Sequence, residues 1–124
     1  MREFARRHKR RSATCGRIIN LSTDAAQSFP GQIIYGASKA AIEALTRSTA
    51  RELGPFGITV NAVAPGPVQT GYISAEQEEK LIGAIPMRRI GVPDDIVHAV
   101  MFLAADQAQW ITGQVIRVAG GHEL

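Results

Sequence analysis

The stretch around which the chain is organised reads Ile33-Ile34-Tyr35-Gly36-Ala37-Ser38-Lys39-Ala40-Ala41. It opens a helical pattern in which Tyr35 and Lys39 are four residues apart, so the phenol and the ammonium face the same side. A free tyrosine has a pKa of about 10 and is a poor acid–base catalyst near neutral pH. A fixed neighbouring cation favours the phenolate and lowers such a pKa. The pair is therefore either a proton-transfer site or an ordinary stacked surface pair, and the flanking sequence has to distinguish these.

The helical pattern that starts at Tyr35 is predicted to run to Leu53, because apolar residues recur there at three- and four-residue steps. Gly54-Pro55 then ends it. On either side, the segments 16–23 and 57–64 are nearly continuous in aliphatic residues, which is typical of buried parallel strands. Hydroxyl residues end the first strand and a Pro- and Gly-rich turn ends the second, at the edge where open α/β sheets bind ligands.

The outer segments extend this pattern. Residues 1–11 are strongly basic and favour the solvated tail of a helix over a nucleic-acid-binding arm, because aromatic interleaving is lacking. A charged helix capped by Ser74 is predicted over 74–85. A largely buried helix is predicted from Pro93, and a last strand over 114–118, with Trp110 packed between the two.

Composition limits the classes of protein to consider. The 124 residues suffice for one domain with a single core, and 45% apolar with 20% charged residues is typical of globular proteins. No apolar run approaches the roughly 20 residues that span a bilayer, and no secretory signal is recognised. The single cysteine is consistent with a reducing, cytoplasmic location. The three histidines lack metal-ligand spacing, so no metal site is predicted.

The expected order of elements is helix–strand–helix–strand–helix–helix–strand. Such an order implies parallel strands joined by right-handed crossovers. The fold class is therefore α/β, as the C-terminal half of a doubly wound, Rossmann-like parallel sheet. Its first strands and cofactor-binding turn are not found in the 124 residues.

Four blocks in order make the chain resemble the short-chain dehydrogenase/reductase family, and within it the reductases related to 3-oxoacyl-carrier-protein reductase. The blocks are Gly16-Arg-Ile-Ile-Asn-Leu-Ser-Thr23, Tyr35-Gly-Ala-Ser-Lys39, Gly57-Ile-Thr-Val-Asn-Ala-Val-Ala-Pro-Gly66 and Thr112-Gly-Gln-Val-Ile-Arg-Val-Ala-Gly-Gly121. The match covers 16–121, the catalytic half of one incomplete domain spanning 1–124.

The resemblance implies hydride transfer between a nicotinamide cofactor and a small-molecule carbonyl or alcohol. Tyr35 would then exchange the proton with the substrate oxygen, and Lys39 would favour the phenolate and bind the nicotinamide ribose. Pro65, Gly66 and Val68 would line the nicotinamide, with Thr70 reaching its carboxamide or the pyrophosphate. The resemblance also implies a homo-oligomer formed through the helix over 35–53, and a lid over 73–90. It implies neither a nucleic-acid nor a membrane partner.

The catalytic hydroxyl is ambiguous. Ser22 lies 13 residues before Tyr35, the spacing expected in the family, yet counting from Gly16 places Thr23 at the usual serine position. Successive strand residues point to opposite faces, so the two hydroxyls cannot serve equally. The spacing favours Ser22, with Thr23 as the alternative.

No Gly-x-x-x-Gly-x-Gly turn that could cradle a pyrophosphate occurs in the sequence. We therefore expect a C-terminal fragment of a reductase that is inactive or impaired as this chain and does not bind NAD or NADP tightly. The residue that distinguishes NAD from NADP would lie upstream, so the two cannot be told apart. The alternative function is a non-catalytic oligomerisation or interaction module.

Overall fold

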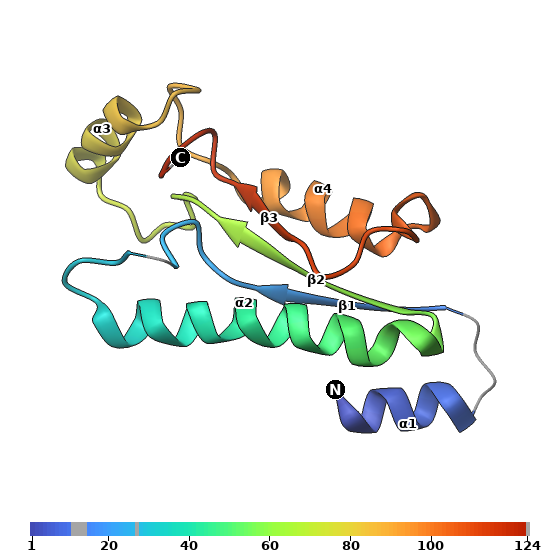
Figure 1. The fold of residues 1–124 in the computed structure, drawn as a ribbon. Coiled ribbons are helices and arrows are strands. Elements are labelled where there is room, and N and C mark those ends of the chain that lie inside the picture. Colours follow the sequence, from blue (N-terminus) through green and yellow to red (C-terminus); the bar gives the residue numbers. More distant parts are fainter. Residues whose placement is uncertain (11–14, 27, 124) are drawn as a thin grey trace.

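The computed structural model describes residues 1–10, 15–26 and 28–123 and contains a parallel sheet in the order β1-β2-β3 (Figure 1). The strands are β1 (Gly16–Leu21), β2 (Ile58–Pro65) and β3 (Val115–Val118). The helices are α1 (Arg2–Arg10), α2 (Ile33–Leu53), α3 (Ala75–Ala84) and α4 (Pro93–Ala104), with short 3-10 turns η1 (Gly54–Phe56) and η2 (Asp106–Ala108). The predicted α/β class with parallel strands is confirmed. Arg11, the last residue of the basic segment over 1–11, and Leu124, the last residue of the predicted domain, lie outside the residues that the structure describes.

The core lies on both faces of β2, whose first seven residues are buried. Strand side chains alternate between faces, so Ile58 and Val60 pack with Ala50 and Leu53 of α2. Val63 points the other way and packs with Leu103 and Ala108 on the α4 side. Figure 1 shows α2 and α4 on opposite sides of the sheet. The continuous apolar run of β2 therefore reflects a strand covered on both faces.

Two predictions about the α4 region are wrong. Among the residues of α4 only Leu103 is buried, and Val97 and Met101 are exposed, because a single stripe of the helix meets the sheet. Trp110 is 96% exposed, since the neighbouring Ile111 is the residue that packs against the Leu103 cluster. In the described part of the chain, no helix is long and apolar enough to cross a membrane.

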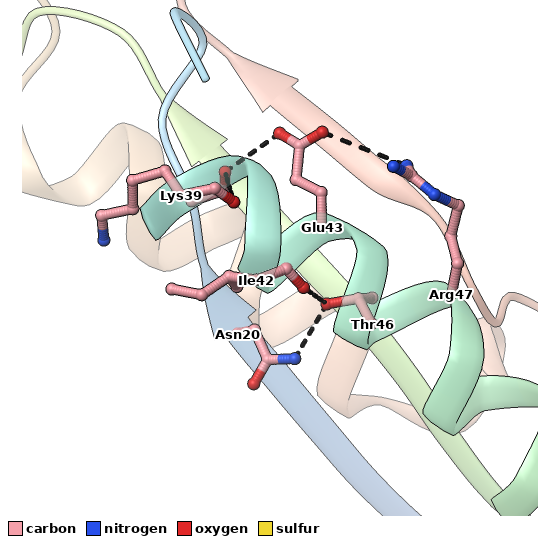
Figure 2. Close-up of polar contacts among 7 residues, drawn as sticks. Asn20, Lys39, Ile42, Glu43, Thr46 and Arg47 are labelled. Atoms are coloured by element: carbon pink, nitrogen blue, oxygen red, sulfur yellow. Dashed lines mark hydrogen bonds and ion pairs between the residues drawn. The ribbon is translucent and has the colours of Figure 1, made fainter. Parts of the chain in front are cut away.

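Helix α2 is fastened to β1 through Thr46, which is completely buried. Its Oγ1 accepts a hydrogen bond from Asn20 Nδ2 at 2.9 Å and donates one to the Ile42 carbonyl at 2.8 Å (Figure 2). A buried polar side chain is tolerated at this interface because its partners satisfy it.

We predict that Thr46→Val lowers the free energy of unfolding by about 1–3 kcal/mol, because it leaves the half-buried Asn20 amide without its acceptor. Urea unfolding measures this loss. The matched control is Thr49→Val, since among the described residues the partners of Thr49 Oγ1 are carbonyls of its own helix. A loss no larger than that of the control would contradict the assigned role of Thr46.

The start of α4 is held by an ion pair. Both nitrogens of the Arg89 fork donate to the Asp95 carboxylate at 2.7 Å, and the Val92 N–H donates to it at 2.8 Å. The Arg89 hydrogen bond, followed by that from Val92, holds the pKa of Asp95 well below its usual range. A carboxylate at the positive end of a helix is also favoured by the helix dipole.

The Arg89–Asp95 pair predicts a pH-dependent stability. A folded-state pKa below the unfolded value means that the stabilisation is present above about pH 4 and is lost as the pH falls further. The difference in unfolding free energy between the wild type and Asp95→Asn should therefore shrink from pH 6 to pH 2. Within the described residues Asp94 forms no ion pair, so Asp94→Asn is the control. A difference independent of pH would disprove this contribution.

Candidate functional site

The candidate site lies where the carboxyl ends of the three strands meet. Backbone pairing continues beyond the strands themselves: the Ser22 N–H bonds to the Val63 carbonyl and the Asp24 N–H to that of Pro65. The Gly66 N–H likewise bonds to the Val118 carbonyl. These bonds bring the segment after β1, the turn after β2 and the segment after β3 to one edge of the sheet, where ligands bind in open α/β folds.

Tyr35 and Lys39 lie together on the first two turns of α2. The Lys39 ammonium nitrogen is 5.5 Å from the centre of the Tyr35 ring and donates to the Leu21 carbonyl at 3.1 Å. The ring of Phe29 meets the Tyr35 ring edge-on, with centroids 5.3 Å apart. Tyr35 is 41% exposed, so its side chain is supported by Phe29 and remains partly open to solvent. The expected proximity of phenol and ammonium is present.

Ser22 points toward α2. Its buried hydroxyl donates to Glu43 Oε1 at 3.0 Å, with the Lys39 carbonyl at 3.5 Å as a weaker acceptor. This is the face that Asn20 shares, as the period of two requires for residues 20 and 22. The Ser22 hydroxyl is therefore engaged with the helix.

Thr23 is also buried, but its hydroxyl donates to Asp24 Oδ1 at 3.3 Å. Within residues 1–10, 15–26 and 28–123, neither Ser22 nor Thr23 forms a hydrogen bond with the Tyr35 hydroxyl. The choice of the catalytic hydroxyl between Ser22 and Thr23 therefore stays a prediction.

The turn after β2 supplies the remaining predicted residues. Pro65, Gly66 and Val68 are half-buried, and Thr70 is exposed. A side chain at position 66 would collide with Ala119, 2.7 Å from an added Cβ, so glycine is required for the close approach to the segment after β3. Gln69 holds the following bend by donating to the Ile73 carbonyl and to Glu78.

Sequence reasoning missed two buried carboxylates. Glu43 accepts a hydrogen bond from the Ser22 hydroxyl at 3.0 Å. Its carboxylate also lies 4.0 Å from the Arg47 guanidinium, and Figure 2 shows Glu43 and Arg47 facing each other on α2. Asp24 pairs at 2.7 Å with His122, which is 98 residues away. Asp24 directly follows a strand, and this position could have identified it as a candidate site residue. No local sequence pattern identifies His122.

The described residues contain no group of three or more His, Cys, Asp or Glu side chains that could hold a metal ion. A cleft of about 360 Å³ lies beside the C-terminal end of β3. Arg89, Arg117, Met87 and His122 are among its lining residues. This cleft adjoins the site through His122 and does not include Tyr35.

Comparison with known proteins places this geometry in a family. A family model described as enoyl-(acyl carrier protein) reductase matches residues 1–123. The chain is 48% identical over 120 residues to an uncharacterized oxidoreductase of Bacillus subtilis, YjdA, covering 96% of this chain and 48% of that protein. It is 50% identical over 110 residues to a 3-oxoacyl-[acyl-carrier-protein] reductase of Staphylococcus aureus, covering 86% and 45% of the two chains.

Solved structures agree. A 3-oxoacyl-[acyl-carrier protein] reductase of Brucella melitensis superposes with a TM-score of 0.85 at 33% identity, covering 91% of this chain and 44% of its own. Another reductase from that organism, solved with bound NAD, gives a TM-score of 0.83 at 34% identity and covers 91% and 43%. The chain spans about half the length of the relatives it matches.

The Ser22–Glu43 hydrogen bond yields a prediction. Ser22→Ala should lower the free energy of unfolding by about 1.5–3 kcal/mol, because a buried carboxylate loses its donor. In a Glu43→Gln background the same substitution should cost less, so that a double-mutant cycle in urea reports the coupling. Ser38→Ala is the control, since the hydroxyl of the exposed Ser38 donates to the Tyr35 carbonyl of its own helix. Additive effects of Ser22→Ala and Glu43→Gln would count against the coupling.

Proposed function

Because the chain belongs to the short-chain dehydrogenase/reductase family, we propose that its site serves hydride transfer between NAD or NADP and a carbonyl or alcohol, with Tyr35 as the acid–base. The observation that carries the proposal is the pair itself. Lys39 is anchored to the Leu21 carbonyl at the strand end and holds its ammonium 5.5 Å from the Tyr35 ring. This arrangement lets a fixed cation stabilise the phenolate that is left when Tyr35 gives up its proton.

The residues present fit the nicotinamide end of a dinucleotide. Lys39 uses one donor on Leu21, which leaves two N–H donors for ribose hydroxyls. Pro65 and Val68 offer a half-buried apolar wall, and the exposed Thr70 offers a hydroxyl. When bound, the dinucleotide supplies or accepts the hydride.

The chain's own residues would handle the oxygen of the substrate. In reduction, the proton on the Tyr35 hydroxyl moves to the substrate oxygen as that oxygen becomes an alkoxide, and Lys39 stabilises the phenolate left behind. Solvent then reprotonates the phenolate. A positioned acid of this kind contributes about 100- to 10,000-fold in rate.

The second hydroxyl is assigned to Thr23. Spacing in the sequence favours Ser22, but the Ser22 hydroxyl is turned toward Glu43 beneath α2. The Thr23 hydroxyl lies on the other side of the strand end and donates to Asp24 Oδ1 at 3.3 Å, so it is not engaged with α2. We therefore assign the holding of the substrate oxygen to Thr23.

The substrate class is proposed to be a 3-oxoacyl thioester or a related ketone. This rests on the 50% identity to the Staphylococcus aureus reductase. The segment 73–90, which contains α3, would act as the lid over such a substrate. Its first turn is fixed by Ser74, whose hydroxyl accepts from the Gln77 N–H while Gln77 returns a bond to the Ser74 N–H.

A second candidate function is an oligomerisation module built on α2. Ile34 and Leu45 are 83% and 48% exposed on this helix, which leaves apolar surface for another subunit. Co-expression with a full-length relative distinguishes the two: a module would be incorporated into the assembly without adding turnover.

The proposed chemistry is tested by NADPH- and NADH-dependent reduction of 3-oxoacyl thioesters. We expect Tyr35→Phe to lower kcat by about 100- to 10,000-fold with an unchanged fold by circular dichroism. Thr23→Val should lower kcat more than Ser22→Ala, and Ser38→Ala should leave kcat unchanged. Full activity in Tyr35→Phe would refute the acid–base role, and titration of the chain with each dinucleotide measures binding separately.

A further inference from the structure

Three segments that are far apart in the sequence meet at the Asp24 side chain. Asp24 follows β1 and is 95% buried, and its backbone N–H donates to the Pro65 carbonyl at 3.0 Å. Its carboxylate accepts from the Thr23 hydroxyl and, through Oδ2, from His122 Nδ1 at 2.7 Å. Oδ2 also lies 3.0 Å from where a Cβ on Gly66 would be.

The proton between His122 and Asp24 can be assigned. An ionised carboxylate only accepts hydrogen bonds, so beside an ionised Asp24 the proton of this contact belongs to Nδ1 of His122. The short distance of 2.7 Å is typical of a charge-assisted bond. The Arg117 guanidinium lines the same cleft as His122. It donates a hydrogen bond to the backbone carbonyl of Glu123.

A buried carboxylate needs such partners, because it is costly to bury without them. Here the partners are the Thr23 hydroxyl and His122. The backbone N–H of Asp24 also donates to the Pro65 carbonyl, at the start of the Pro65–Gly66 turn. The segment that carries His122 is tied to the same place, since the Gly66 N–H bonds to the Val118 carbonyl. Moving His122 would therefore release Asp24, and with it the direction of the Thr23 hydroxyl.

We propose that Asp24 and His122 form a positioning pair that orients the Thr23 hydroxyl and holds the Pro65–Gly66 turn against it. The pair touches neither substrate nor dinucleotide and acts through these two elements. Where the inference concerns catalysis it rests on the proposed function, but the arrangement itself is independent of activity.

The arrangement is tested first without turnover. Nitrogen-15 NMR of His122 should show a protonated Nδ1, and amide exchange of Asp24 and Gly66 should be at least tenfold faster in His122→Ala than in the wild type. His122→Asn should restore protection, because the Asn side-chain nitrogen occupies the position of Nδ1, whereas His122→Gln should not. A ring protonated on Nε2 alone, or equal exchange in all variants, would overturn the positioning pair.

The catalytic consequence is tested by kinetics. His122→Ala should lower kcat between about 10- and 100-fold, as misplaced catalytic groups do, with His122→Asn close to the wild type. In a Thr23→Val background His122→Ala should have little further effect on kcat, which a general loss of stability would not reproduce. Equal losses in both backgrounds would overturn the role toward Thr23. If the wild type shows no turnover, as the expected impairment of this chain implies, the NMR and exchange results decide the pair.

Discussion

Strand β2 is the constraint on which the structure depends, because it is buried on both faces and bonded on both edges. Ile58 and Val60 meet α2, Val63 meets the α4 side, and β1 and β3 pair with it in parallel. Parallel pairing makes the carboxyl ends of all three strands point the same way. The residues after each strand are therefore collected at one edge, and a site there follows from the pairing.

The end of β1 lies between two buried carboxylates. The consecutive hydroxyls of Ser22 and Thr23 donate to Glu43 and Asp24, respectively. Glu43 holds the strand end from α2, and Asp24, the residue after Thr23, is itself held by His122 from the segment after β3. Such contacts contribute little net stability, since desolvation offsets much of their energy, but they restrict the strand end to one arrangement. A catalytic hydroxyl benefits from that restriction more than from stability.

Much of the fold was predictable because it follows from periodicity. Local hydrophobic patterns predict the strands around residues 18 and 60 and the helix from Tyr35 to Leu53. The proximity of Tyr35 and Lys39 follows from their four-residue separation on that helix. The errors arise where tertiary packing decides. Trp110 was expected in the core and is exposed, while Glu43 has the charge of a surface residue and is buried. The Asp24–His122 contact joins residues 98 apart and has no local signal.

The register of α2 on β1 determines where Tyr35 lies. Descending the helix from its start, Lys39 reaches Leu21, Glu43 reaches Ser22 and Thr46 reaches Asn20. Each step of three or four residues advances about 4.5–6 Å along the helix, so these contacts follow one another along the face of α2 that meets β1. A helix locked by a buried Thr46 and a buried Glu43 cannot slide by a fraction of a turn without leaving polar groups unpaired. The phenol of Tyr35, near the start of α2, is consequently positioned by contacts made by residues up to eleven positions later in the helix. This positioning of the start of α2 is what the acid–base role proposed for Tyr35 requires.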